Sequence, residues 1–287
     1  MNYHWLNSIL LLALLCNIVE AKIAIFTHYF GQPEFIKYQY LFFKKNLLDE
    51  YELNVFDDSN DILTSEKIRY ECDKYGIKHI RIPRVVFDFP KLPIIDDYVG
   101  HTSPSFECAV AIQYIYDNYV VPSDKICLLI DNDIFLISPF SIEKFIGSDS
   151  FAYNPQSNGV ADYMLPNFLI LNPSKMPEKE SLDFNLGVIK GNRTDSGGFT
   201  HFYLQKYRNL GKVISTHYFY DNNSSLNKKF ITTCPLLFTA TEWGSYYFVD
   251  KETFLHLRMG SNWSRHNSYY NIVNEMAFFF NQLLQDS

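Results

Sequence analysis

The stretch LLIDNDIFLI, residues 128–137, is the most informative part of this chain of 287 residues. Asp131 and Asp133 stand between two apolar runs, which indicates that they lie between buried segments rather than in a loose polar loop. Residues i and i+2 of an extended chain project to the same side, so both carboxylates can address one site where the strand ends. Oxygen ligands of this kind suit Mg²⁺ or Mn²⁺, with a phosphate supplying further ligands. A solvated turn is the alternative interpretation of an Asp-x-Asp pair taken alone.

The composition is typical of an enzyme-sized globular protein. Hydrophobic residues make up 47% of the chain, so it can bury a large core as one domain or as two packed lobes. The formal net charge is −7, and Lys and Arg are scattered along the sequence. That distribution excludes the basic patch that a nucleic-acid-binding protein would need, and we expect no nucleic-acid partner.

Strands and helices alternate along the first half of the chain. Apolar runs predict strands at 22–29, 51–56, 78–82 and 125–130, and helical spacing predicts helices at 33–48, 65–75 and 106–120. This order predicts an α/β fold with a mostly parallel sheet flanked by helices. Ligands bind such sheets beyond the carboxyl ends of the strands. The polar residues that we expect to converge there are Thr27, His28, Asp57, Asp58, Asp131 and Asp133.

The first 21 residues resemble a secretory signal peptide. An apolar core from Ile9 to Cys16 is followed by Ala21, a small residue suited to a cleavage site. We expect cleavage after Ala21 and a protein that is secreted or lies in the lumen of the secretory pathway, with a short membrane anchor as the alternative. The mostly apolar stretch is only about 15 residues long and contains two Asn, so no stable membrane span is expected.

Cleavage of this leader would leave four cysteines, a number that permits up to two disulfides. Their wide spacing excludes a zinc finger. Cys127 lies inside the apolar run that precedes Asp131, and we expect it to be a buried free thiol. Sequons that would make an exported chain a glycoprotein occur at Asn192, Asn222, Asn223 and Asn262.

The element order and the acid pair together resemble a GT-A-fold glycosyltransferase of the nucleotide-diphospho-sugar transferase superfamily. The segment NFLILNPSK, residues 167–175, is similar to the strand that follows the acid pair in this family. The segment FLHLRMGSNW, residues 254–263, resembles the late His segment of glycogenin-like members. Leu165, Pro166 and Asn167 stand where the family usually has Asn-Ser/Ala-Gly, and no Lys-Pro-Trp follows Gly260.

The resemblance implies a metal-dependent glycosyltransferase that takes a UDP- or GDP-sugar as donor and an unknown glycan, protein or lipid as acceptor. It makes Asp133 and His256 ligands of Mn²⁺ or Mg²⁺, and it places Asp131 against the metal or the donor ribose. A His among oxygen ligands favours Mn²⁺ over Ca²⁺. Such a cation would stabilise the negative charge that accumulates on the departing diphosphate.

Other positions have expected roles around the donor and the acceptor. Arg258 shares a face with His256 if that segment is a strand, where its guanidinium could meet a phosphate. His28 and Tyr29 could flank the nucleotide base. We expect a single domain at 22–287, in which 22–140 form the half that binds the nucleotide-sugar and 141–287 form the acceptor half.

Two carboxylates are candidates for the catalytic base near the acceptor hydroxyl, Asp195 in TDSGGF and Glu242. Two alternative functions stay open beside the transferase. One is a secreted, inactive GT-A-like domain that binds sugar or a partner protein. The other is a Mg²⁺-dependent phosphatase of the haloacid dehalogenase type, although Phe135 and the late position of the acid pair depart from that family's pattern.

Overall fold

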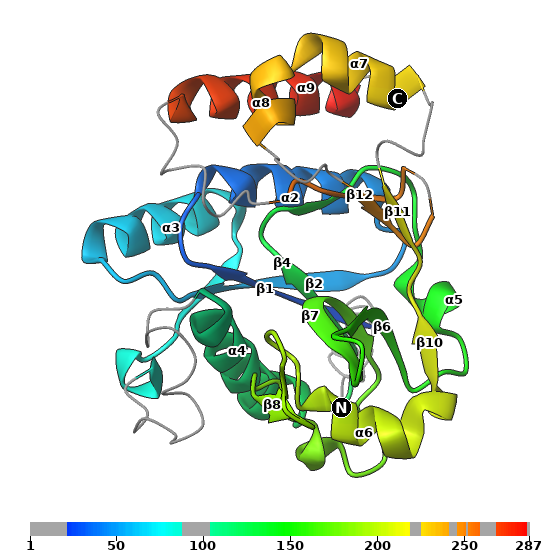
Figure 1. Cartoon of the computed structure of the whole chain (residues 1–287). Helices are drawn as coiled ribbons and strands as arrows, with labels where there is room; N and C mark the ends of the chain where they lie inside the picture. The colour runs from blue at the N-terminus through cyan, green and yellow to red at the C-terminus, as the bar shows by residue number, and fades with distance from the viewer. Residues whose placement is uncertain are drawn as a thin grey trace, which may run out of the picture.

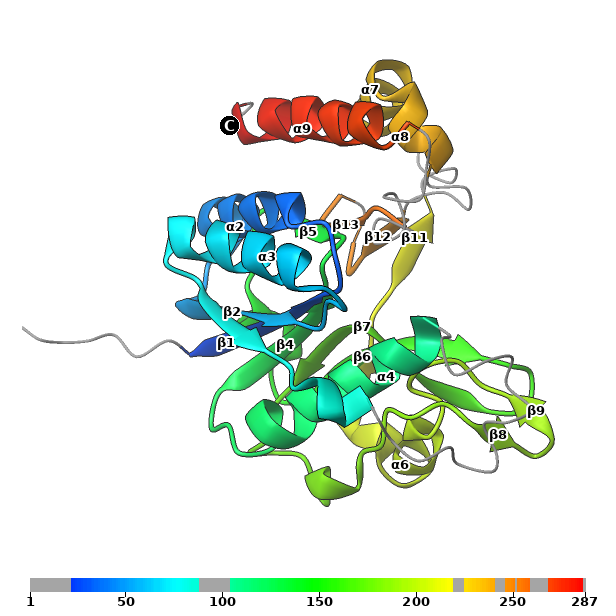
Figure 2. The same ribbon diagram turned by 90° about the vertical axis from the view of Figure 1, so that its left-hand side faces the viewer.

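The computed structural model describes residues 22–87, 104–218, 225–240, 246–250, 252–258 and 268–285. A seven-stranded sheet lies at its centre (Figures 1 and 2). Its strands, in spatial order, are β10 (Gly211–Val213), β6 (Phe151–Ser157), β7 (Asp162–Leu171), β4 (Ile126–Asp131), β1 (Ile23–Tyr29), β2 (Tyr51–Asp57) and β3 (Lys78–Arg81). Strand β7 runs antiparallel to β4 and β6, and the remaining neighbours are parallel. The predicted fold class is therefore confirmed, and one sheet takes strands from both expected halves of the chain.

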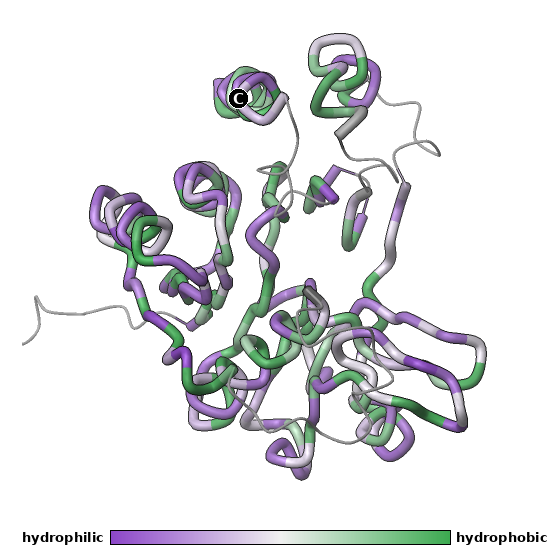
Figure 3. Tube along the Cα trace, turned by 60° about the vertical axis from the view of Figure 1, so that its left-hand side comes forward, coloured by the Kyte–Doolittle hydropathy of each residue, from purple (hydrophilic) through white to green (hydrophobic). Residues whose placement is uncertain are grey.

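Helices cover both faces of this sheet. The helices α2 (Glu34–Asn46) and α3 (Ile62–Tyr75) lie over one face, and α4 (Pro104–Ile115) and α6 (Thr200–Tyr207) lie over the other (Figures 1 and 2). Strand β1 is apolar from Ile23 to Phe26, in keeping with the burial of both of its sides. Ile23 and Ile25 pack in the core beneath α2, whereas Ala24 and Phe26 pack in the core beside α4. In Figure 3, hydrophobic and hydrophilic stretches alternate along the helices.

A smaller antiparallel sheet joins segments that are distant in the sequence. Its strands, in spatial order, are β11 (Thr216–Tyr218), β12 (Tyr246–Phe248), β13 (Phe254–His256) and β5 (Ile134–Leu136). The helices α7 (Ser225–Thr233), α8 (Pro235–Ala240) and α9 (Tyr269–Gln285) stack beyond α2 (Figure 2). Phe280 of α9 packs its ring 5.1 Å from that of Phe42 in α2. The remaining elements are α5 (Ile142–Ile146), β8 (Val188–Ile189), β9 (Asn192–Arg193), the π turn Tyr116–Val120 that extends α4, and 3₁₀ turns at Arg84–Phe87, Lys179–Ser181 and Arg208–Leu210.

Helix α3 begins three residues before the predicted start at residue 65. Asp61 caps it, since its side chain accepts a hydrogen bond of 2.8 Å from the backbone N–H of Thr64. The helix ends at Gly76, whose φ of 65° lies in the left-handed region that favours glycine. The sequence rule that missed this start relied on apolar spacing, which the exposed side chains of Ile62 and Leu63 do not follow.

The four cysteines in the described part of the chain are all free thiols. Cys127 is fully buried, which confirms the expectation for that residue. None of the helices that the structure describes is both long and apolar enough to cross a membrane. The expected leader and three of the four sequons lie outside the described residues, and Asn192 is exposed at the start of β9.

Asp57 ties the carboxyl ends of β2 and β3 together. Its buried carboxylate accepts hydrogen bonds from Ser59 (2.6 Å), from Ser65 and from His79 (3.3 Å), and it pairs with Arg81. Burial by itself raises the pKa of Asp57, but the bonds from His79, Ser59 and Ser65 outweigh it and lower the pKa to about 2. The charged form of Asp57 is therefore stabilised by folding.

Replacing Asp57 by asparagine should reduce the free energy of unfolding by about 2 kcal/mol near neutral pH, which is the shift from 3.8 to about 2 expressed as energy. Because the folded pKa is the lower one, this stability is complete above about pH 4 and is lost as the pH falls toward 2. Urea unfolding of both proteins between pH 7 and pH 3 measures it. The control is Glu52→Gln on the same strand, which breaks an exposed ion pair with Lys125 and should cost less than about 1 kcal/mol. Equal losses in the two variants would contradict the prediction.

Candidate active site

Three potential metal ligands converge at the carboxyl end of β4. Asp131 is the last residue of β4, Asp133 lies in the turn between β4 and β5, and His256 is the last residue of β13. One ligand atom from each lies within 4.8 Å of the others. Asp133 and His256 are only 4% and 6% exposed, whereas Asp131 is half-buried. The structure therefore brings together the acid pair and the late His that the resemblance implied as metal ligands.

Backbone pairing fixes His256 beside the acid pair. Strand β13 runs antiparallel to β5, with His256 opposite Ile134. The pairing continues past the strands, because the N–H of Leu257 donates a 2.9 Å hydrogen bond to the carbonyl of Asp133. The imidazole also stacks on the buried ring of Phe248, with centroids 5.8 Å apart. The position of His256 is therefore set by the small sheet.

The two carboxylates meet for a different reason from the one that the sequence suggested. Alternation along an extended strand was expected to place Asp131 and Asp133 on the same side. In the structure the strand ends at Asp131, and Asn132 and Asp133 form a turn before β5 begins. The turn links β4 to β5 of the small sheet and leaves one ligand atom of each carboxylate within 4.8 Å of His256, without strand alternation.

The donor atoms suit a divalent cation. Oδ1 of Asp133 lies 3.1 Å from Nε2 of His256, yet this buried oxygen accepts no hydrogen bond from any residue that the structure describes. A buried carboxylate oxygen without a donor is costly, because it has lost its hydration. A cation between the two groups would coordinate both, and two carboxylates with one imidazole form a ligand set suited to Mn²⁺ or Mg²⁺.

A cavity of about 200 Å³ adjoins this cluster. It contains four residues selected from the sequence: Asp131, Asp195, His256 and Arg258. Arg258 and His256 line the same cavity, although β13 ends at His256 and strand alternation does not extend to Arg258. The other lining residues are Cys108, Gln156, Leu165, Pro166, Asn167 and Ser196.

Asp195 enters the cavity from a tight turn that packs against β7. The backbone N–H of Ser196 donates a 2.8 Å hydrogen bond to Oδ1 of Asp195, and the N–H of Asp195 lies 3.3 Å from the hydroxyl of Tyr163. Gly197 follows with a φ of 84° and no room for a side chain, because a Cβ would lie 2.1 Å from the carbonyl oxygen of Met164. The hydrogen bond from Ser196 orients the carboxylate of Asp195, and the contact with Tyr163 holds its backbone.

His28 lies at the end of β1, directly beside Asp131. Its Nε2 is 3.2 Å from Oδ1 of Asp131 and 4.0 Å from Sγ of Cys108, and its Nδ1 is 3.9 Å from Oδ2 of Asp58. Burial disfavours protonation of His28, but Asp131, Cys108 and Asp58 together raise its pKa well above the ordinary value. Burial also raises the pKa of Asp58, to about 6. This group therefore supports one flank of the acid pair.

The other positions selected at strand ends lie elsewhere. Thr27, Tyr29 and Asp57 have no exposed surface, so none of them is open to a nucleotide in this structure. The hydroxyl of Tyr29 donates to Gln39, and Asp57 is occupied by the contacts described above. Glu242 lies outside the described residues.

Sequence reasoning missed two amide side chains in the cavity, Gln156 and Asn167. Asn167 is buried, and its Oδ1 accepts a 3.3 Å hydrogen bond from Nδ2 of Asn154. The Oδ1 of Asn154 in turn accepts a hydrogen bond from the hydroxyl of Thr216. The available signal was the polar position inside the otherwise apolar strand β7, which is unusual unless the side chain has a partner.

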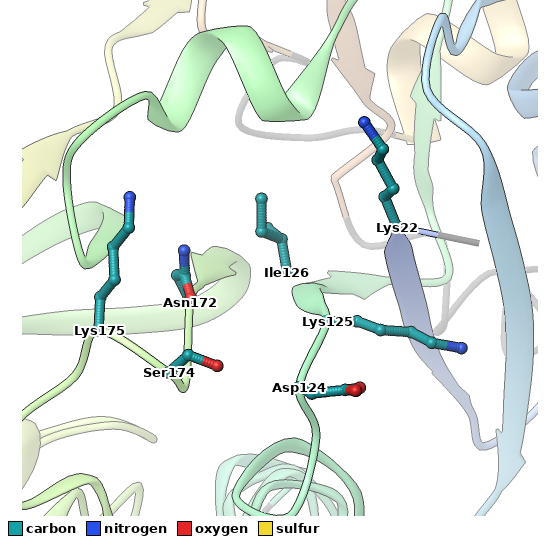
Figure 4. A pocket seen from close by; sticks show the side chains of 7 residues that line it. All are labelled: Lys22, Asp124, Lys125, Ile126, Asn172, Ser174 and Lys175. Atoms are coloured by element: carbon teal, nitrogen blue, oxygen red, sulfur yellow. The ribbon is translucent and has the colours of Figure 1, made fainter. Parts of the chain in front are cut away.

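A larger cavity, of about 460 Å³, opens at the amino ends of β1 and β4, opposite the candidate metal ligands. Figure 4 shows the side chains of Lys22 and Lys175 extending one way and those of Asp124 and Lys125 another. Each lysine ammonium has its own acceptor. Lys22 pairs with Glu143, Lys175 donates to the carbonyl of Gly147, and Lys125 pairs with Glu52. Charges in this cavity therefore do not converge on a single point, unlike those around Asp133.

No family model matches the chain, and no curated protein matches it. Among solved structures it resembles the glycosyltransferase GlyE of Streptococcus pneumoniae TIGR4, with a TM-score of 0.44 and 12% identity over 93% of this chain and 62% of that one. It resembles glucosyl-3-phosphoglycerate synthase of Mycobacterium tuberculosis (TM-score 0.38, 11% identity, 68% and 70% coverage) and the galactosyltransferase LgtC (0.33, 13%, 66% and 66%). This chain thus spans less than two thirds of the length of GlyE.

These scores and identities are low, so the function proposed below rests on the geometry of the site. The names of the three solved proteins describe a glycosyltransferase, a glucosyl-3-phosphoglycerate synthase and a galactosyltransferase.

Proposed function

We propose that this protein is a metal-dependent glycosyltransferase that transfers a sugar from a nucleoside diphosphate donor. The observation that carries the proposal is the convergence of Asp131, Asp133 and His256 beyond the carboxyl end of a central parallel strand. The adjoining cavity contains a carboxylate, Asp195, and a guanidinium, Arg258. A metal site, a cation for phosphate and a further carboxylate in one crevice match the needs of sugar transfer from a diphosphate.

The ligands have separate tasks in this proposal. Asp131, Asp133 and His256 would hold Mn²⁺ or Mg²⁺, which supplies Lewis-acid stabilisation of the charge on the departing diphosphate. Arg258 would bind a phosphate oxygen, because its planar guanidinium can donate two parallel hydrogen bonds. His28 would keep Asp131 in place through the 3.2 Å contact between its Nε2 and Oδ1 of Asp131.

Asp195 is the residue that we assign to the reacting sugar or the acceptor. Its carboxylate is half-buried in the cavity, where it could accept a proton from an acceptor hydroxyl or hold a sugar hydroxyl. The amide groups of Gln156 and Asn167 line the same space and can both donate and accept hydrogen bonds, as sugar hydroxyls require. Together they give the acceptor side a polar lining opposite the metal ligands.

The site belongs to a single domain at 22–287 in this proposal, and the leader at 1–21 directs export. The secretory pathway supplies the nucleotide-sugars and the glycan, protein or lipid acceptors that such an enzyme needs. The domain limits and the leader rest on the sequence pattern described above.

Calorimetric titration of the mature protein with UDP and with GDP, in Mn²⁺ and in EDTA, tests the proposal. We expect one nucleotide to bind in Mn²⁺ and its affinity to fall at least about 10-fold in EDTA, since the cation bridges protein and diphosphate. His256→Ala should weaken the metal-dependent binding by a similar factor, while leaving the weak binding in EDTA unchanged.

Two results would count against the transferase. Failure of both nucleotides to bind in Mn²⁺ would leave the inactive binding domain as the better interpretation. Cleavage of a phosphomonoester such as p-nitrophenyl phosphate, abolished by Asp131→Asn, would instead favour the phosphatase.

A further inference from the structure

The turn that carries the acid pair is held from behind by one buried amide. Gln39, on α2, is 1% exposed. Its Nε2 donates a 2.8 Å hydrogen bond to the carbonyl of Asp131 and a 3.0 Å hydrogen bond to the carbonyl of Ile134. These two carbonyls belong to the residues on either side of Asn132 and Asp133. One side chain therefore spans both ends of the turn.

The chemistry of this contact allows only one orientation of the amide. Backbone carbonyls accept hydrogen bonds and cannot donate them, so the NH₂ group must face the turn. The remaining oxygen, Oε1, accepts a 2.7 Å hydrogen bond from the buried hydroxyl of Tyr29 at the end of β1. Both the NH₂ group and the oxygen of the amide are therefore hydrogen-bonded, and these bonds link β1, α2 and the turn.

Packing makes α2 a firm support for this contact. The rings of Phe35 and Phe42 lie 5.7 Å and 6.3 Å from that of Phe135, which is in β5 just after the turn. Aromatic contacts of this kind fix the helix against the strand. The amide of Gln39 therefore acts from a rigid helix.

We propose that Gln39 is a positioning residue for the metal site: it fixes the distance between the two ends of the turn and so holds Asp131 and Asp133 in coordinating geometry. This inference rests on the proposed function, because it concerns the same cation. Metal ligands need to be held within a fraction of an ångström, and residues that only support ligands commonly change metal affinity about 10- to 100-fold when they are replaced.

The helix offers a matched control in Asn46. It lies two turns after Gln39 on the same face of α2, is equally buried, and its Nδ2 donates a 2.8 Å hydrogen bond to the carbonyl of Leu136 in β5. Both side chains thus make the same kind of contact from the same helix to the same chain segment. Of these two side chains, only Gln39 donates hydrogen bonds to Asp131 and Ile134, the residues on either side of Asn132 and Asp133.

The experiment measures Mn²⁺ affinity of the full chain by the electron paramagnetic resonance signal of free Mn²⁺, without nucleotide. Gln39→Met keeps the volume of the side chain and removes its donors, and Asn46→Leu does the same at the control position. We expect affinity to fall about 10-fold or more in Gln39→Met and to stay within about 3-fold in Asn46→Leu. Amide hydrogen exchange of the peptide 128–137, measured without metal, should quicken only in Gln39→Met.

The outcomes separate this inference from the proposed function. Absence of Mn²⁺ binding by the unmodified chain, both without nucleotide and in the presence of UDP or GDP, overturns both. Binding by the unmodified chain with equal affinity in Gln39→Met, or equal losses in the two variants, overturns the positioning role alone. If Gln39→Met does not fold, Tyr29→Phe decides, since it removes only the hydroxyl that orients the amide; an affinity that is unchanged in Tyr29→Phe then overturns the inference.

Discussion

Replacing Asp133 by alanine is expected to lower metal-dependent sugar transfer or donor hydrolysis by about 10³-fold or more. The carboxylate is buried beside His256, 3.1 Å from its Nε2, and contributes one of three candidate ligands. A coordinated cation supplies several kcal/mol of stabilisation to the departing diphosphate, and about 4 kcal/mol corresponds to about 10³-fold in rate. Release of UDP or GDP from a panel of nucleotide-sugars in Mn²⁺ measures the effect.

A thermal readout separates loss of metal from loss of fold. The metal-free variant should melt at or above the temperature of the unmodified chain, because it no longer buries a carboxylate oxygen that lacks a hydrogen-bond donor. Mn²⁺ should raise the melting temperature of the unmodified chain and not that of Asp133→Ala, since only the former gains stability from binding.

The control for this variant is Asp124→Ala, which removes an exposed carboxylate just before β4, at the end of that strand away from Asp131. It should leave both the activity and the shift in Mn²⁺ unchanged. Comparable activity in Asp133→Ala and the unmodified chain would show that Asp133 holds no catalytic cation.

Gly197→Ala is expected to reduce the free energy of unfolding by at least about 3 kcal/mol and to abolish activity. Two costs combine at this position: an L residue is strained at a φ of 84°, and a Cβ would lie 2.1 Å from the carbonyl oxygen of Met164. Relief of that clash would move the turn away from β7. Asp195, two residues earlier, would then lose its place in the cavity.

Gly159→Ala is the matched control, because Gly159 has a φ of 88° but open space where a Cβ would be. Only the backbone strain remains there, and the expected loss is about 1 kcal/mol. Urea unfolding of both variants, with nucleotide release measured in Mn²⁺, provides the comparison. Equal losses of stability would mean that the turn at Gly197 can move without cost, contrary to the packing described here.

Much of the fold was accessible from the sequence because its signals are local. The apolar runs and helical spacings predicted β1, β2, β3, β4 and α2 to within two residues, since each element buries side chains with its own period. The apolar run of β4 indicated a buried strand, and the alternation of strands with helices indicated helices on both faces of the sheet. The acid pair after β4 was visible for the same reason, because polar residues that interrupt a buried run are conspicuous.

The site itself required tertiary structure. His256 reaches Asp133 through the pairing of β13 with β5, a register between distant segments that no local pattern specifies. The hydrogen bonds from Gln39 to the carbonyls of Asp131 and Ile134 could not be predicted, because a single glutamine in an amphipathic helix has no distinctive spacing.

The residue pattern alone predicted the α/β class and the acid pair Asp131 and Asp133, because hydrophobic periodicity and carboxylate spacing belong to individual segments, whereas His256 and Arg258 were selected through the resemblance to GT-A glycosyltransferases. Only the tertiary structure decided that Thr27, Tyr29 and Asp57 are buried away from the crevice. Accessibility and ligand distance depend on how separate segments pack against one another, and that packing is a property of the whole chain.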